Sequence, residues 1–184
     1  MISTVMMDKI SSLLDSRQIM QLPSWNRTRK VFSPFLSQTA YPTGTDSNPS
    51  WVAVDDFNQD QYLDIAVVNS GTHNIGIFLA YGNGTFSSLV TSSTNNIYSP
   101  MSLSVGHFDN DTYLDIAVAS FGNNNVCILF GYGNGSFGNA VCHTSGYDSR
   151  PSTVIAGDVN GDNMIDVVIA NVGSSTIELL TKIC

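Results

Sequence analysis

Ten of the 15 acidic residues of this 184-residue chain are gathered into three short segments. They are Asp55, Asp56, Asp60 and Asp64; Asp109, Asp111 and Asp115; and Asp158, Asp162 and Asp166. Crowded carboxylates repel one another unless a cation neutralises them. A set of oxygen ligands suits a hard ion such as calcium, whereas zinc prefers histidine and cysteine. The chemistry that these segments could perform is therefore cation binding.

The third segment shows the clearest ligand spacing. Counted from Asp158, side-chain oxygens fall at positions 1, 3, 5 and 9, which are Asp158, Asn160, Asp162 and Asp166. Alternate residues of a tight loop can point inward together, and the main-chain carbonyl of Met164 at position 7 can add an oxygen. We expect a calcium cage that is closed by Asp166.

The acidic segments belong to a repeat with a period of 51 residues, which decides the architecture. The sequence Tyr62–Val67 recurs unchanged at Tyr113–Val118, and a variant of it occupies Met164–Ile169. The same shift relates Tyr81–Phe86 to Tyr132–Phe137, and Pro49 to Pro100 and Pro151. We therefore divide the chain into units 49–99, 100–150 and 151–184.

Each unit is predicted to contain four strands. In the first unit these are residues 50–54, 63–69, 75–81 and 86–92, and the acidic loop joins the first two. The run Ile65–Val68 is apolar on both faces, as in a strand inside stacked sheets. Lys, Arg and Glu, which usually cover helices, number only three after residue 31. We expect an all-β fold, a β-propeller segment of about three four-stranded blades.

The acidic loops and the Tyr-Gly-Asn-Gly-Thr-Phe turn resemble FG-GAP or VCBS-type repeats, the blades of integrin-α-like propellers. The resemblance implies calcium loops between two strands of each blade, and roles in adhesion or ligand recognition outside the cell. The family pattern is matched at Asp56, Asn58, Asp60 and Asp64 in loop one and at Asp158, Asn160, Asp162 and Asp166 in loop three. With the carbonyls at position 7, the candidate ligands also include Tyr62 and Met164, and loop two adds Asp109, Asp111, Tyr113 and Asp115. Loop two departs from the pattern because His107 stands at position 1.

Position 6 is a second departure, because the family favours glycine there for a positive φ. This chain has Gln61, Thr112 and Asn163, of which asparagine tolerates that conformation best and β-branched threonine worst. The fit to a calcium site therefore decreases in the order loop three, loop one, loop two, and we expect two to three ions. The alternative is that these side chains only make turn hydrogen bonds, which does not explain one ligand spacing three times.

Composition and charge exclude some classes of function. Residues 31–184 carry a net charge of −11, which repels phosphate backbones, so we expect no nucleic-acid partner. No apolar run reaches the length of about 18 residues that a spanning helix needs, so we expect no membrane insertion. Residues 1–30 carry +3 and are predicted to hold one short amphipathic helix or a remnant of another domain.

Residues 31–48 resemble an outer strand that precedes the first full unit. The third unit stops before its own fourth strand, so this first strand could complete the last blade of a ring. Three blades are fewer than the roughly four to eight that closed propellers have. We therefore read the chain as part of a larger propeller, with a dimer of two three-blade halves as the other option.

Cys127 and Cys142 lie on the predicted third and fourth strands of the second unit. If Asn134-Gly135 forms a two-residue turn, the two cysteines stand directly opposite each other. The same count places them at a hydrogen-bonded pair, which is the less favourable position for a disulfide. A bridge and two buried thiols both remain open, and Cys184 has no partner in either case.

No motif predicts catalysis. The glycine pattern in residues 133–138 lacks the following helix that a phosphate site requires, and His73, His107 and His143 lie at unrelated places in the repeat. We expect a non-catalytic, calcium-binding recognition or adhesion module that is extracellular or at the cell surface, with an unknown protein or glycan ligand. The alternatives are a lectin that stacks sugars on Trp51, Tyr98 or Tyr147, and an accessory domain of a larger enzyme.

Overall fold

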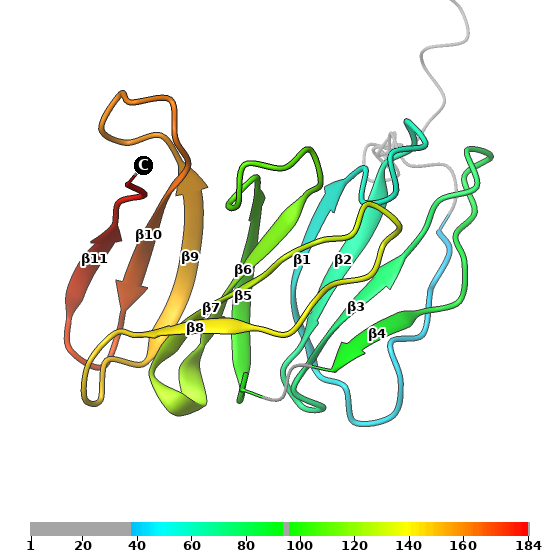
Figure 1. Cartoon of the computed structure of the whole chain (residues 1–184). Coiled ribbons are helices and arrows are strands. Elements are labelled where there is room, and N and C mark those ends of the chain that lie inside the picture. The colour runs from blue at the N-terminus through cyan, green and yellow to red at the C-terminus, as the bar shows by residue number, and fades with distance from the viewer. Residues whose placement is uncertain (1–37, 94–95, 184) are drawn as a thin grey trace, which may run out of the picture. The chain divides into compact units, whose positions relative to one another are not determined.

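The computed structural model describes residues 38–93 and 96–183, and within these the fold is all-β (Figure 1). Eleven strands are assigned in this part of the chain, together with one 3₁₀ turn, η1 (Phe121–Asn123). The first sheet holds β1 (Pro49–Asp55), β2 (Asp64–Asn69), β3 (Asn74–Phe78) and β4 (Val90–Ser93). The second holds β5 (Pro100–Gly106), β6 (Asp115–Ser120), β7 (Asn125–Leu129) and β8 (Val141–Thr144), and the third holds β9 (Pro151–Gly157), β10 (Asp166–Asn171) and β11 (Thr176–Leu180).

Each sheet is an antiparallel meander in sequence order, as propeller blades are. The sheets follow the 51-residue units, and the first strand of each begins with a proline. Proline has no N–H to donate within a sheet, and the first residue of a strand is a position where it is tolerated. The predicted fold of about three blades is confirmed. The third sheet has three strands among the described residues.

The predicted third and fourth strands are longer than the observed ones. Ala80 and Phe86 form only an isolated bridge, and the continuous ladder resumes where Ile77 pairs with Val90. The register shifts by one residue between these two points, so a β-bulge interrupts the outer strand. For this reason β3 ends at Phe78 and β4 starts at Val90, where the sequence predicted 75–81 and 86–92.

Cys127 and Cys142 are cross-strand partners, as predicted, and they form a disulfide. Their Cα atoms are 4.0 Å apart, a spacing typical of a non-hydrogen-bonded pair, so the predicted pair type was wrong. The cause lies in the hairpin. Tyr132 N donates to Ser136 O, which makes the loop three residues long, and a one-residue register shift follows before β8.

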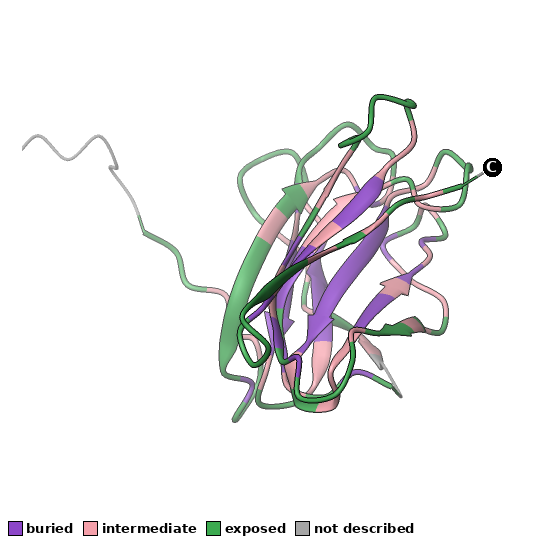
Figure 2. Ribbon diagram, turned by 90° about the vertical axis from the view of Figure 1, so that its left-hand side faces the viewer, coloured by how far each residue is buried: buried purple, intermediate pink, exposed green. Residues whose placement is uncertain are grey.

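The hydrophobic core lies between the sheets. One cluster joins the first sheet to the second, and the other joins the second sheet to the third. All six residues of β6 are buried, since this strand has a sheet on either side, whereas β11 is largely exposed (Figure 2). The blades therefore depend on one another for burial of their apolar faces.

Most of the predicted segments that precede the first blade, residues 1–30 and 31–37, lie outside the described residues. Residues 38–48 are described and contain no strand. Tyr41 packs against Phe78 and Phe86, with ring centroids 5.8 and 5.3 Å away. No helix in the described part of the chain has the length and apolarity needed to cross a bilayer.

Candidate metal centre

The three acidic loops each join the first and second strands of a sheet, so they lie along one edge of the array, at the top of Figure 1. Neighbouring loops are in contact. Gln59 Nε2 of loop one donates to the Thr112 carbonyl of loop two at 3.0 Å. Lys182 Nζ, just after β11, donates to Asn110 Oδ1 of loop two at 2.7 Å.

The aspartate at position 9 is the first residue of β2, β6 or β10 and is fully buried in each sheet. Both of its carboxylate oxygens accept main-chain N–H groups. Asp64 accepts from Phe57 at 3.0 Å and Ala80 at 2.7 Å, Asp115 from Phe108 at 2.6 Å and Gly131 at 2.9 Å, and Asp166 from Val159 at 3.1 Å and Lys182 at 2.9 Å. Each aspartate thus joins its own loop to the end of the third strand.

Loops one and three share one hydrogen-bond pattern. In loop one, Asp56 accepts from Asp60 N at 3.1 Å and from Gln61 N at 2.7 Å. In loop three, Asp158 accepts from Gly161, Asp162 and Asn163 N–H groups at 2.7, 3.2 and 2.9 Å. The position-1 carboxylate therefore shapes the loop around itself in both blades.

Position 3 in these two loops carries an amide. Asn58 Nδ2 donates to Asp60 Oδ2 at 2.9 Å, and Asn160 Nδ2 donates to Asp162 Oδ2 at the same distance. The amide nitrogen thus meets a carboxylate oxygen that a cation would otherwise attract. The amide oxygens of Asn58 and Asn160 accept from the N–H at position 5, so the residues at positions 3 and 5 are hydrogen-bonded to each other in both loops.

Loop two has carboxylates at both positions 3 and 5. Oxygens of Asp109, Asp111 and Asp115 all lie within 4.8 Å of one another. His107 Nδ1 donates to the Tyr113 carbonyl at 2.8 Å, so the imidazole at position 1 binds the carbonyl at position 7. Loop two therefore brings three carboxylates together, while its position-7 oxygen is shared with histidine.

Position 6 follows the expectation from side-chain type. Gln61 and Asn163 adopt φ of +71° and +64°, whereas Thr112 is not among the residues with positive φ. A β-branched side chain disfavours that conformation. In loops one and three the N–H at position 6 donates to the position-1 carboxylate, whereas loop two has His107 and no carboxylate at that position.

The pKa shifts of two buried carboxylates and one exposed carboxylate have opposite directions. Burial raises the pKa of Asp64 above its usual value, against the lowering by the Ala80 and Phe57 N–H groups, and Asp60 and Asp56 add to the rise. Burial likewise raises the pKa of Asp115, with Asp109 and Asp111 as the nearby negative charges. By contrast, main-chain N–H donors, Asn163 first, lower the pKa of the exposed Asp158. Asp64 and Asp115 are therefore sites where a nearby cation would favour ionisation.

The sequence alone did not indicate the N–H groups after the third strand that hold the position-9 aspartates. Ala80, Gly131 and Lys182 each follow their aspartate by 16 residues, so the repeat carried a positional signal. The side chains differ, however, and only the main chain takes part. Residue types therefore gave no indication of this contact.

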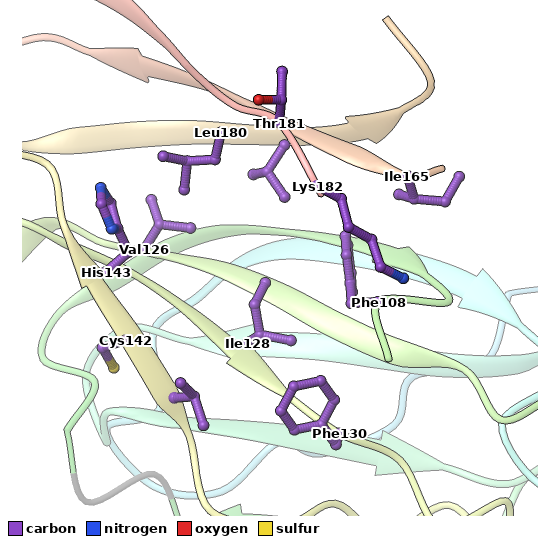
Figure 3. A pocket seen from close by; sticks show the side chains of 12 residues that line it. Phe108, Val126, Ile128, Phe130, Cys142, His143, Ile165, Leu180, Thr181 and Lys182 are labelled. Carbon is purple, nitrogen blue, oxygen red and sulfur yellow. The ribbon is translucent and has the colours of Figure 1, made fainter. Parts of the chain in front are cut away.

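An apolar pocket of about 390 Å³ lies between the outer strands of the second and third sheets (Figure 3). Its walls include Phe108, Ile128 and Leu180, and His143 and Lys182 lie at its margin. In the corresponding region between the first two sheets, Phe137 and Ala140 pack against the core. Phe137 meets Phe57 at 6.0 Å in an edge-on arrangement. The pocket therefore marks the place that a fourth strand takes in the neighbouring blade.

Meandering four-stranded blades with an acidic loop at one edge define a propeller-type repeat protein. A family model for FG-GAP-like repeats matches residues 56–118 and again residues 107–169. The two matches are offset by the 51-residue period and together cover more than half of the chain, so the chain belongs to the FG-GAP-like repeat family. No curated protein matches it.

Proposed function

We propose that this chain is a non-catalytic, calcium-binding propeller module for recognition or adhesion outside the cell. The observation that carries the calcium proposal is the repeated loop. All three blades present side-chain oxygens at positions 3, 5 and 9, and in loop two the oxygens of Asp109, Asp111 and Asp115 lie within 4.8 Å of one another. This oxygen-only set fits a hard divalent cation.

The residues that would hold the ions are those at positions 1, 3, 5 and 9, with the carbonyl at position 7. In loops one and three these are Asp56, Asn58, Asp60, Tyr62 and Asp64, and Asp158, Asn160, Asp162, Met164 and Asp166. In loop two they are Asp109, Asp111 and Asp115, with Tyr113 contributing once its carbonyl is released by His107. A bound cation would supply positive charge where loop carboxylates surround a buried aspartate.

Ion counting tests this proposal. We expect isothermal titration of the full chain with calcium to give two to three ions, and Asp162→Asn to remove one of them. Asp46→Asn is the matched control, because Asp46 is exposed, lies outside the loops and adopts a φ of +56° that asparagine tolerates. A titration without heat or saturation in the native chain would refute calcium binding.

The extracellular placement is supported by the Cys127–Cys142 disulfide, since such bonds persist mainly in oxidising compartments. Sequons at Asn83 and Asn134 lie in exposed hairpin turns. We expect the native protein to be oxidised at this pair and to lose mass on enzymatic deglycosylation. A reduced, unglycosylated native protein would contradict an extracellular location.

A glycan ligand is the second candidate, and it is favoured by exposed aromatic side chains. Tyr147 is 100% exposed, Tyr98 56% and Trp51 42%. Tyr98 already packs against His73 in a tilted arrangement, with ring centroids 4.2 Å apart, so Tyr147 is the most accessible ring of the three. Binding on a glycan array that is lost in Tyr147→Ser would select the lectin reading, and a blank array would favour a protein ligand.

A further inference from the structure

The two end sheets of the array expose apolar faces whose counterparts are buried between blades. We call the face of the first sheet that points away from the second the leading face, and the face of the third sheet that points away from the second the trailing face. The two internal interfaces each pair one leading face with one trailing face.

The leading face is open at its inner strand. Val52 of β1 is 63% exposed, whereas the residues one and two repeats later, Leu103 and Val154, are 2% and 1% exposed. Val54 and Leu63 are 58% and 62% exposed on the same side. Among the described residues, Tyr41 covers the outer part of this face, at Phe78 and Phe86.

The trailing face is open in a complementary manner. Ile177 of β11 is 71% exposed, but its counterparts Ile75 and Val126 are 0% and 2% exposed. Leu179 is 48% exposed, while Ile77, at the same place in the first blade, is fully buried. Ile155 and Val159 extend this apolar surface.

Polar groups at the inner strands match as well. In the interface between the second and third sheets, Ser102 Oγ accepts from Val154 N at 3.0 Å and Ser104 Oγ accepts from Ala156 N at 2.9 Å. Thr153 stands one repeat after Ser102 and keeps the hydroxyl. The Val52 N–H stands two repeats before that of Val154. The hydroxyl of Thr153 on the trailing face and the N–H of Val52 on the leading face are therefore the acceptor and donor equivalent to Ser102 and Val154.

We propose that two copies of this chain associate head to tail, with the trailing face of each on the leading face of the other. The joint would repeat the interface that the chain already forms twice within itself. An arrangement that pairs unlike faces must close into a ring or grow as a filament. Two copies place six blades in the ring, within the range of about four to eight, whereas three copies would exceed it.

The test is the mass of the full chain in solution by size-exclusion chromatography with light scattering. The native chain is expected to have the mass of two chains. Val52→Glu and Ile177→Glu should each have the mass of one chain, because each places a charge in both joints of the ring. Val172→Glu is the matched control. Val172 is 56% exposed in the turn after β10, outside both faces, and this variant should keep the mass of two chains.

Mixing the two interface variants identifies the kind of interface. Val52→Glu retains a native trailing face and Ile177→Glu a native leading face, so the mixture should recover a two-chain species at higher concentration than the native chain needs. Circular dichroism melts confirm that both variants are folded. A native chain with the mass of one chain, a ladder of larger masses, a dimer that survives Val52→Glu, or a mixture that stays monomeric would each overturn the proposal.

Discussion

At the scale of single residues, Asp64, Asp115 and Asp166 have one observed role and one proposed role. Each accepts two main-chain N–H groups and each would also be a calcium ligand. A carboxylate oxygen has two lone pairs, so one oxygen can accept a hydrogen bond and still face a cation. The observed structural role of these residues is therefore compatible with the proposed ion-binding role.

Replacing the buried and exposed aspartates of loop two should separate these roles. Asp115→Asn leaves one of the N–H groups of Phe108 and Gly131 without an acceptor, because an amide has only one carbonyl oxygen. We expect a loss of about 1–3 kcal/mol in the free energy of unfolding in calcium-free buffer, measured with urea.

Asp109→Asn is the control for this substitution. Asp109 is exposed and its Oδ1 accepts from Asp111 N, a bond that an amide oxygen can keep. Its calcium-free stability should change little. Equal stability of the two variants would show that the contacts of Asp115 do not stabilise the fold.

The pH dependence of stability should reverse when calcium is added. The pKa values of Asp64 and Asp115 are raised in the folded state, so their favourable contribution is complete below their usual pKa and is lost as the pH rises through the raised values. The lowered pKa of Asp158 has the opposite sign. Its favourable contribution to stability is complete above the usual aspartate pKa and is lost only as the pH falls below that value.

Urea unfolding between pH 7 and about pH 4.5 measures this effect, since the usual aspartate pKa is about 3.9. In calcium-free buffer we expect the midpoint to rise as the pH falls. In calcium it should fall, because protons displace the ion. Midpoints that follow the same trend in both buffers would contradict the assignment of Asp64 and Asp115.

The repeat and the side-chain spacing located the candidate residues at equivalent places in the three blades, and the limits of this prediction are physical. Side-chain spacing located Asp158, Asp162 and Asp166 on one loop, and the residue at position 6 anticipated the positive φ of Asn163. The bond from His107 to the Tyr113 carbonyl could not be predicted, because it depends on the fold of the loop and on no shared residue type.

At the scale of elements, the outer hairpin of the second blade is held by the Cys127–Cys142 disulfide between β7 and β8. The bond closes a loop of 15 residues, for which chain entropy predicts about 3 kcal/mol of stabilisation. We expect the double variant Cys127→Ala/Cys142→Ala to lose up to about this amount in denaturant unfolding.

Thiol titration provides the corresponding check on pairing. The native chain, unfolded without reductant, should expose one reactive thiol, that of Cys184, which lies outside the described residues. Three reactive thiols would show that the bridge does not form in the protein.

The hairpins also show what a strand prediction can and cannot do. The cross-strand partnership of Cys127 and Cys142 followed from their distance to the turn. The loop around Asn134 is one residue longer than predicted, and the bulge that follows it shifts the register back by one residue. The predicted partners were therefore right, although the predicted pair type was wrong. Bulges leave no reliable mark on residue types, whereas alternation and turn residues do.

At the scale of the whole molecule, the 51-residue period predicted the sheets, their order and their boundaries. It could not indicate what covers the end faces, because Val52 and Ile177 have the same apolar character as their buried counterparts. Exposure in the folded array is what distinguishes them. The proposed pairing of these faces therefore rests on the structure.

Thermal unfolding of the full chain with calcium and with a chelator tests the central claim most directly. A ligand that binds only the folded state raises the melting temperature, so we expect a clear rise in calcium that is reversed by chelator and absent with magnesium at the same concentration. A cooperative melt at one temperature in all three conditions would mean that the aspartates only build turns, and it would contradict the calcium-binding account.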